Sequence, residues 1–314
     1  MSGVVTGFAI ILAVIAVGYL LARRGVIGGG SERLMFNRVA FFAATPALLF
    51  SSVAESDPGH FLSPVVLVIF LATAATAAVY CVISAFAFRQ DVATTAMGAA
   101  SSSYFNSVNI GLPVSIYVIG DATHVVPVLV LQMVVFTPMI LAAIGTDNTA
   151  GAGGRSTGAK VAEAVKNALL SPVVLASFAG LAVSLADITI PEPVMAPIEI
   201  LGGASIPMIL MSFGASLVSG GALSSAEDRP GAITATLLKV VGMPLIAWLL
   251  GLALGLDGDM LYVAVILAAL PTAQNVYNYA ATYERGMTVA RDSVFLTTFA
   301  SLPAMLVIAL LFGR

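Results

Sequence analysis

The sequence predicts an all-α polytopic membrane protein whose ten transmembrane helices form two inverted five-helix repeats. Three observations lead to this fold class: the scarcity of charged residues, the confinement of basic residues to alternate loops, and matching motifs in the two halves. Of the 314 residues, 59% are hydrophobic and 9% are charged, and the mean hydropathy is +1.03. Soluble domains usually contain about 25% charged residues. The composition therefore excludes a soluble fold and predicts a chain embedded in the lipid bilayer.

Ten apolar stretches approach the roughly 20 residues that a helix needs to cross a bilayer. They are residues 3–22, 36–54, 64–88, 93–119, 124–145, 168–187, 194–218, 231–254, 259–283 and 289–312. The first lacks a basic N-terminal region and is long enough to span, so it is expected to be a membrane helix and not a signal peptide. Cys81 is the only cysteine of the sequence, which excludes a disulfide or a cysteine metal site within one chain.

The basic residues fall on one side of the membrane in this topology. One set of alternate loops contains eleven of them: Arg23, Arg24, Arg33, Arg38, Arg89, Arg155, Lys160, Lys166, Arg229, Arg285 and Arg291. The opposite side has Arg314 alone, and its loops are otherwise acidic or neutral. Because loops rich in Lys and Arg stay in the cytoplasm, both termini are expected outside. The same distribution requires an even number of spans.

The two halves share short motifs at a nearly constant offset. Three pairs of segments correspond, at offsets of 162, 161 and 158 residues: Gly18 with Gly180, Thr45-Pro46 with Ile206-Pro207, and Gly111-Leu112-Pro113 with Ala269-Leu270-Pro271. Five spans is an odd number, so the second copy is inverted relative to the first. The predicted organisation is a first repeat at 1–145, a cytoplasmic linker at 146–167 and a second repeat at 168–314, which is the plan of alternating-access carriers.

The fourth and ninth spans contain the same irregularity, a proline beside a cluster of amides. In the fourth span, Asn106, Asn109 and Pro113 follow the spacing of one helix face. In the ninth, the residues on one face are Pro271, Gln274, Asn275 and Asn278. A single amide would be assigned to hydrogen bonding between helices. Two matched clusters beside helix-breaking prolines instead favour the binding site of a secondary transporter.

The chemistry of such a site follows from the helix breaks. The half-helices expected after Pro113 and Pro271 begin with unpaired N–H groups and a partial positive charge. Their N-termini are expected to face each other and to favour a small anion such as a carboxylate. Amide side chains add neutral donors without the cost of a fixed buried charge. The candidate binding residues are Asn106, Asn109, Gly111, Pro113, Lys239, Pro271, Thr272, Gln274, Asn275 and Asn278. Freed carbonyls near Ser103, Asn106 and Asn275 are an alternative site for Na⁺.

Lys239 lies inside the eighth span, and the sequence leaves two interpretations of it open. Its long stem can snorkel to the interface, or its ammonium can face the substrate path. Acids are scarce: Glu199 and His124 are the candidates for a proton pathway, and both are expected at the interface. Coupling to Na⁺ or to protons therefore stays open, and no other cofactor is expected.

Several segments resemble the auxin efflux carrier family. They are Phe36–Phe50, Asn106–Pro113, Lys239–Pro244 and Ala269–Asn275, in the family's order and over nearly the whole chain. The long hydrophilic loop of the plant hormone exporters is replaced by about twenty residues. The chain is thus similar to short bacterial members of the family, a group that includes malonate transporters, which implies a bacterial inner (plasma) membrane.

The resemblance implies more than the composition does. The fold would be that of bile-acid sodium symporters, with spans 1, 2, 6 and 7 as a scaffold and spans 3–5 and 8–10 as a transport domain. The substrates would be small organic anions, such as malonate or auxin-like acids, moved by an elevator-type motion, and a homodimer would be expected. Asn106 and Pro113 match the first crossover of the family and Pro271 the second; Asn109 and Asn278 are added from their spacing alone.

The sequence also bears on functions other than secondary transport. A channel could use the same broken helices, but inverted repeats favour alternating access. An intramembrane enzyme is not expected, since neither a His-Glu-x-x-His nor a Gly-x-Ser-x-Gly motif is present. The linker segment Gly153–Lys160 resembles a phosphate loop, but Ala159 occupies the lysine position, so neither a nucleotide nor a nucleic acid is expected. A membrane-embedded sensor that binds without transport stays open.

Overall fold

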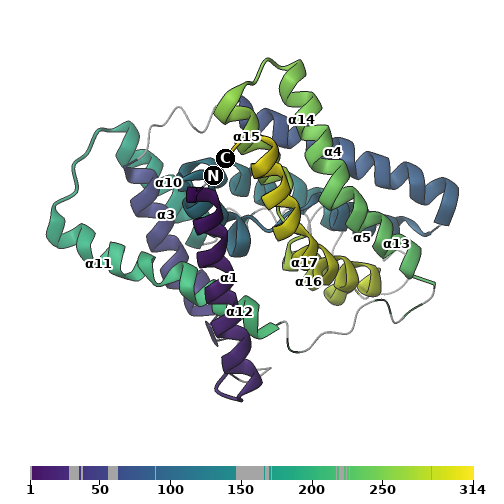
Figure 1. Ribbon diagram of the computed structural model, residues 1–314, viewed down its shortest axis with the longest axis horizontal. Helices are drawn as coiled ribbons and strands as arrows, with labels where there is room; N and C mark the ends of the chain where they lie inside the picture. Colours follow the sequence, from purple (N-terminus) through teal and green to yellow (C-terminus); the bar gives the residue numbers. More distant parts are fainter. Residues whose placement is uncertain are drawn as a thin grey trace. The chain divides into compact units, whose positions relative to one another are not determined.

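The computed structural model is helical throughout the part of the chain that it describes (Figure 1). The described residues are 2–27, 35–36, 38–55, 63–88, 90–145, 166, 170, 172–216, 218, 223, 225, 227–283 and 285–314. One isolated antiparallel β-bridge, between Phe105 and Thr272, is present among them, and no longer strand. The predicted linker at 146–167 lies outside the described residues, apart from Lys166.

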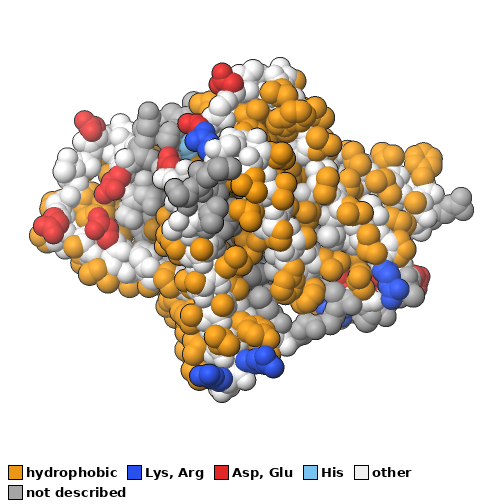
Figure 2. Space-filling view, in the orientation of Figure 1, with side chains coloured by type: hydrophobic (Ala, Val, Ile, Leu, Met, Phe, Trp, Pro, Cys, Tyr) orange, Lys and Arg blue, Asp and Glu red, His pale blue; other side chains and the backbone are white. Residues whose placement is uncertain are grey.

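Several of these helices have the length and composition of membrane spans. Within the described residues, four long apolar helices qualify: Pro64–Phe88, Glu192–Ser212, Arg229–Ala253 and Met287–Leu311. Large hydrophobic side chains are exposed on them and elsewhere, among them Phe86, Ile200 and Leu311 at 82%, 76% and 79% exposure. Figure 2 shows such side chains over α13 and α14. Exposed apolar surface on this scale suits lipid and not water, so the prediction of an all-α membrane protein is confirmed.

The chain folds into two compact units, each built from separate parts of the sequence. Unit 1 comprises Met1–Ser63, Val108–Pro127 and Leu169–Gly220, and unit 2 comprises Pro64–Ser107, Val128–Ala168 and Gly221–Arg314. The helices of unit 1 are α1 (Ser2–Arg23), η1 (Ala40–Ala44), α3 (Thr45–Ala54), η4 (Ser107–Gly111, from Val108 on), α6 (Leu112–Val114), η5 (Ser115–Ile119), η6 (Ala122–His124), α10 (Pro172–Leu185), α11 (Glu192–Gly203) and α12 (Ser205–Ser216).

Two helix pairs form the core of unit 1, and glycines allow their close approach. α1 packs along α12, and α10 packs along α3. A Cβ atom at Gly18 would overlap the backbone oxygen of Met211, and one at Gly180 would lie against the backbone oxygen of Phe50. A hydrogen bond of 2.8 Å joins the buried hydroxyls of Thr45 and Ser205. Small residues at these contacts let the helix backbones meet, which is how helices associate in lipid.

Replacing Gly18 with alanine is expected to destabilise unit 1. The added methyl group would force α1 away from α12 at a backbone contact that cannot rotate aside, at a cost of about 1–3 kcal/mol. The melting temperature of the purified protein measures the effect. The matched control is Gly203→Ala, because a Cβ atom at Gly203 meets nothing within 4 Å. Equal melting temperatures for the two variants would show that α1 and α12 do not pack this closely.

Unit 2 contains the remaining helices. They are α4 (Pro64–Ile83), η3 (Ser84–Phe88), α5 (Val92–Ser103), α7 (Val125–Leu131, from Val128 on), η7 (Gln132–Phe136), α8 (Thr137–Gly145), α13 (Arg229–Leu237), η10 (Leu238–Gly242), α14 (Met243–Ala253), α15 (Gly258–Ala268), α16 (Gln274–Tyr283) and α17 (Met287–Leu311). α4 packs against α5, α14 and α15, and α17 packs against α5, α13 and α16.

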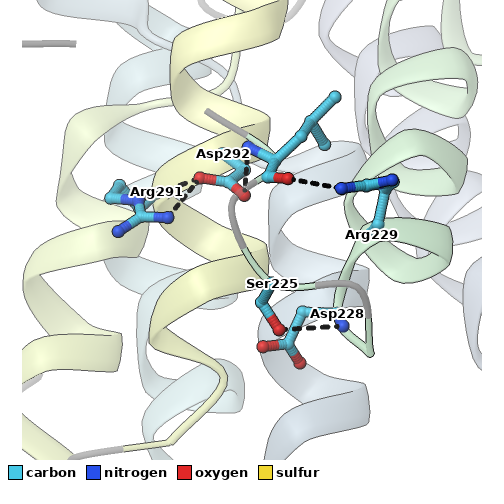
Figure 3. Close-up of polar contacts among 6 residues, drawn as sticks. Ser225, Asp228, Arg229, Arg291 and Asp292 are labelled. Carbon is cyan, nitrogen blue, oxygen red and sulfur yellow. Dashed lines mark hydrogen bonds and ion pairs between the residues drawn. The ribbon is translucent and has the colours of Figure 1, made fainter. Parts of the chain in front are cut away.

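One end of unit 2 contains a network of charged groups (Figure 3). The carboxylate of Asp292, which is 1% exposed, pairs with Arg291 and accepts a hydrogen bond of 2.9 Å from the backbone N–H of Leu223. Arg229 donates to the carbonyl of Leu223, also at 2.9 Å. These contacts fix Leu223 in a left-handed conformation, with φ of 62°, at the entrance to α13.

The opposite end of unit 2 has a different charge pattern. Arg314, after the 25-residue helix α17, pairs with Asp259 at the start of α15.

At the end of unit 2 that contains Asp292, Asp91 caps α5 by accepting from the N–H of Thr94 at 3.0 Å. Partial burial alone would raise the pKa of the Asp91 carboxyl, but the hydrogen bonds from Thr94 and the charge of Arg285 hold it below its ordinary value. Arg229, Arg285 and Arg291 thus share one end of unit 2.

Candidate substrate site at a helix crossing

Two interrupted helices of unit 2 cross where both backbones are extended. α5 ends at Ser103 and α15 ends at Ala268, while helical structure resumes at Ser107 and Gln274. Between these points, residues 104–106 and 271–273 run antiparallel and exchange two backbone hydrogen bonds. The N–H of Asn106 donates to the carbonyl of Pro271 at 2.8 Å, and the N–H of Ala273 donates to that of Tyr104 at 3.0 Å. We call these two segments the crossing.

Thr272 links three elements at the centre of the crossing. Its side chain is fully buried, and its hydroxyl donates to the carbonyl of Ser101 at 2.6 Å, in the last turn of α5. Its backbone N–H donates to the hydroxyl of Thr297 on α17 at 3.0 Å. A helix end leaves carbonyl groups without intrahelical partners, and here a threonine from the other interrupted helix satisfies one of them. Thr272 therefore fixes the two breaks to each other.

Gln132 forms hydrogen bonds to the residues on both sides of the first helix break. This residue is 1% exposed and begins η7. Its amide nitrogen donates to the carbonyl of Phe105 at 2.9 Å, and its amide oxygen accepts from the hydroxyl of Ser107. It thus bridges the last extended residues and the first helical residue after them. Sequence reasoning missed Gln132, although one amide in the apolar run Val128–Phe136 is the kind of signal that could have identified it.

Lys239 lies fully buried beside the crossing, so the snorkelling interpretation is wrong. Its Nζ donates to the carbonyl of Ala268 at 2.6 Å and to the sulfur of Met243 at 3.0 Å. The same atom lies 5.3 Å from the centroid of the Phe105 ring. Snorkelling requires a path to the interface, and η10 instead directs the stem toward the C-terminal end of α15. Among the described residues, the buried charged side chains are Lys239 and Asp292.

The first break lies N-terminal to the position that the sequence analysis expected. Helical structure is continuous from Ser107 to Ile119 through η4, α6 and η5, and Pro113 is buried within it. The expected half-helix after Pro113 is therefore wrong. Proline disturbs the turn that precedes it, because it cannot donate to the carbonyl four residues earlier, and here the π-helical turn Ser107–Gly111 occupies that position. At Pro271 the interruption includes the proline itself.

The remaining predicted residues fall in different places. Asn106 is 9% exposed and lies in the crossing, whereas Gln274 is half-buried and Asn275 exposed in the first turn of α16. The side chain of Asn278, also on α16, lies outside the described residues. Asn109, Gly111 and Pro113 belong to unit 1, beyond the unit boundary at Ser107. Unit 2 thus brings together Asn106, Lys239, Pro271, Thr272, Gln274 and Asn275.

The other groups considered for cations are Ser103, Glu199 and His124. The hydroxyl of Ser103 donates to the carbonyl of Ala99 at 2.8 Å. In unit 1, Glu199 is exposed on α11, and His124 lies 3.8 Å from the carboxylate of Asp121. Neither of these two proton candidates belongs to unit 2, where the crossing lies.

The electrostatics of the crossing differ from the sequence-based expectation. That expectation considered the two helix N-termini alone. Because the paired segments are antiparallel, the C-terminal ends of α5 and α15 meet at the same place as the new helix starts at Ser107 and Gln274. Helix ends contribute about half a unit charge each, of opposite sign, so their effects largely offset one another. Among the described residues, Lys239 is the basic side chain buried beside the crossing.

Comparison with known proteins identifies the family of the chain. The family model described as "Membrane transport protein" matches residues 4–309. The chain belongs to this membrane transport family. The resemblance to auxin efflux carriers is thereby confirmed, and the protein is a membrane transporter.

Two relatives illustrate the breadth of the family. The chain is 28% identical over 309 residues to a "Putative malonate transporter" of Rhizobium meliloti (strain 1021), covering 95% of this chain and 92% of the relative. It is 29% identical over 165 residues to a "Probable auxin efflux carrier component 9" of Oryza sativa subsp. japonica. That second similarity covers 48% of this chain and 36% of the plant protein.

Proposed function

We propose that this transporter is a secondary carrier of small organic anions, with malonate-like carboxylates as its substrates. The observation that supports the proposal is the crossing of two interrupted helices with one buried ammonium, that of Lys239, beside it. Interrupted helices are the usual binding elements of secondary transporters. A buried cation without a carboxylate partner favours an anionic ligand, since attraction between charges is strong where water is excluded.

The proposed binding groups are those of the first turn of α16. Its N–H groups lack intrahelical acceptors, and Gln274 and Asn275 add amide donors that are at least partly exposed. Amides recognise a carboxylate without the cost of a second buried charge. Lys239 has no exposed surface, so it acts on the anion through its field and not by direct contact. Asn106 contributes from the crossing itself.

The two compact units overlap in part with the proposed scaffold and transport domain. Unit 1 contains the described parts of predicted spans 1, 2, 6 and 7, and unit 2 those of spans 3, 8, 9 and 10, with spans 4 and 5 divided between the two. We propose that spans 3–5 and 8–10 move the crossing through the membrane, as in an elevator mechanism, while spans 1, 2, 6 and 7 stay fixed.

The inverted repeat is supported by contacts at equivalent positions. Gly18 and Gly180 each meet a backbone oxygen of a partner helix, at Met211 and Phe50 respectively. The two glycines are offset by 162 residues and their partners by 161. The α1–α12 and α10–α3 pairs are thus equivalent under exchange of the repeats. This agreement supports ten spans in two inverted copies. A bacterial inner-membrane location with both termini outside, and a homodimer, remain part of the proposal on the basis of the loop charges and the family resemblance.

A binding experiment tests the substrate class. The melting temperature of the purified protein would be measured with malonate, other small mono- and dicarboxylates, and malonamide, which has the same shape without charge. Stabilisation that saturates with malonate and is absent with malonamide is the expected result, because ligands that bind the folded state raise its stability. Equal effects of malonate and malonamide would contradict an anion site.

Replacing Asn275 with aspartate is expected to abolish carboxylate binding. The change preserves the size of an exposed side chain, so the protein should remain folded, but it places a negative charge where the anion binds. Asn275→Ala removes an amide without adding charge and should weaken binding by less, about tenfold for the loss of one hydrogen bond to a charged ligand. Titration of malonate against both variants measures which substitution weakens binding more. Equal affinity in wild type and Asn275→Asp would remove α16 from the site.

A further inference from the structure

We propose that the C-terminal end of α15 is a monovalent-cation site that the ammonium of Lys239 occupies from within the chain. The proposal rests on the proposed function, since it concerns the coupling of that transport. It predicts that the wild-type carrier needs no Na⁺, and that removal of the Lys239 side chain creates a Na⁺ site.

The end of α15 has the properties of a cation site. The carbonyl of Leu267 cannot accept from residue 271, because Pro271 has no N–H, and it accepts instead from the N–H of Leu270 at 3.3 Å. The carbonyl of Ala268 would accept from the N–H of Thr272 in an unbroken helix, but that N–H donates to Thr297. The last turn therefore presents the carbonyl oxygen of Ala268, freed from its backbone donor, at the negative end of a helix dipole. Carbonyls and half-helix C-terminal ends of this kind coordinate Na⁺ in secondary transporters.

Lys239 fills this position with a complete set of neutral cation-binding groups. The ammonium contacts the carbonyl of Ala268 at 2.6 Å, the sulfur of Met243 at 3.0 Å and the face of Phe105 at 5.3 Å from its centroid. A carbonyl, a thioether and an aromatic face each attract a cation without neutralising it. Within the described residues no carboxylate contacts Lys239, so its charge stays available to the crossing.

The local structure of span 8 directs Lys239 to this place. Lys239 lies in the π-helical turn Leu238–Gly242, directly before Met243 and Pro244. A single π-helical turn inside an α-helix is a frequent mark of a functional position. At the first break, the freed carbonyl of Ser101 accepts from the neutral hydroxyl of Thr272 and not from a cation. The buried ammonium of Lys239 therefore belongs to the second repeat. One positive charge in the site suits one anionic substrate.

Two substitutions separate the charge of Lys239 from its volume. Lys239→Ala removes the ammonium and leaves space beside the carbonyl of Ala268 for a Na⁺ ion. Lys239→Met removes the charge but keeps the volume, so an ion cannot enter. The melting temperatures of wild type and both variants would be measured in NaCl and in choline chloride of equal ionic strength. The expected result is stabilisation by Na⁺ of Lys239→Ala alone, because the ion binds its folded state.

Uptake of malonate into proteoliposomes gives the second measurement. Wild type should transport equally well in Na⁺ and choline, Lys239→Ala should lose at least about tenfold in choline and recover in Na⁺, and Lys239→Met should be inactive in both. Wild-type uptake that requires Na⁺, or a folded Lys239→Ala variant on which Na⁺ has no effect, would overturn the proposal. If Lys239→Ala does not fold, the Na⁺ dependence of wild type still decides it. Absence of uptake by wild type would contradict the proposed function instead, and the melting temperatures would still test the cation site.

Discussion

Replacing Thr272 with valine is expected to reduce transport at least about tenfold while leaving the protein folded in the membrane. Valine has nearly the shape of threonine but lacks the hydroxyl that donates to the carbonyl of Ser101 at 2.6 Å. The change leaves that buried carbonyl unsatisfied, which costs about 1–3 kcal/mol, and about 1.4 kcal/mol corresponds to a factor of ten. Because the bond joins the two interrupted helices, the loss should appear in substrate affinity and transport rate.

The matched control for this variant is Thr76→Val on α4. Thr76 is also fully buried, but its hydroxyl donates to the carbonyl of Ala72 within its own helix, at 2.7 Å. That bond joins no other element, so its removal should leave malonate uptake close to wild type. The comparison of initial uptake rates, normalised to reconstituted protein, measures the difference. Similar rates for the two variants would show that the crossing does not depend on Thr272.

Replacing Gln132 with leucine is expected to have an effect of similar size on transport. The substitution removes the donor to the carbonyl of Phe105 and the acceptor of the Ser107 hydroxyl, and it leaves both groups buried without their partner. The extended segment 104–106 would then lose its support from η7. We expect reduced malonate affinity and a lower melting temperature of the purified protein.

Gln132→Glu provides a more selective test of the same bridge. An ionised glutamate only accepts hydrogen bonds, so it keeps the bond from Ser107 but loses the donor to Phe105. A protonated carboxyl group has an O–H that can donate again. Transport by Gln132→Glu should therefore recover as the pH falls, whereas transport by Gln132→Leu should stay low at every pH. A pH profile of Gln132→Glu that parallels that of Gln132→Leu would show that the hydrogen bond to Phe105 is unimportant.

The sequence predicted the interrupted helices but not the residues that hold them together. Pro271 and the amides of α16 gave a pattern that marks a break, because proline removes a backbone donor whatever surrounds it. Pro113 gave the same pattern, yet the helix continues through it, since a π-helical turn before a proline can absorb the missing bond. Periodicity along one chain does not show which of these two outcomes applies.

Contacts between residues far apart in the sequence explain why the sequence did not predict the role of Gln132 or the orientation of Lys239. Gln132, Thr297 and Ser101 contribute single hydrogen bonds to the crossing, and nothing in their neighbouring residues indicates a partner more than 20 positions away. The two interpretations of Lys239 were likewise open, because a lysine stem within a span can point in either direction along the membrane normal. Only the packing of η10 within unit 2, against α5 and α17, directs its ammonium to the carbonyl of Ala268.

Counterflow of radiolabelled malonate in proteoliposomes tests the central claim most directly. Vesicles loaded with unlabelled malonate and diluted into a trace of labelled malonate should accumulate label transiently above equilibrium, because an alternating-access carrier exchanges one substrate molecule for another. Thr272→Val should reduce this overshoot, and Thr76→Val should not. Equilibration of label without an overshoot would indicate a channel. No uptake at all, with malonate still raising the melting temperature, would indicate a sensor and contradict the account.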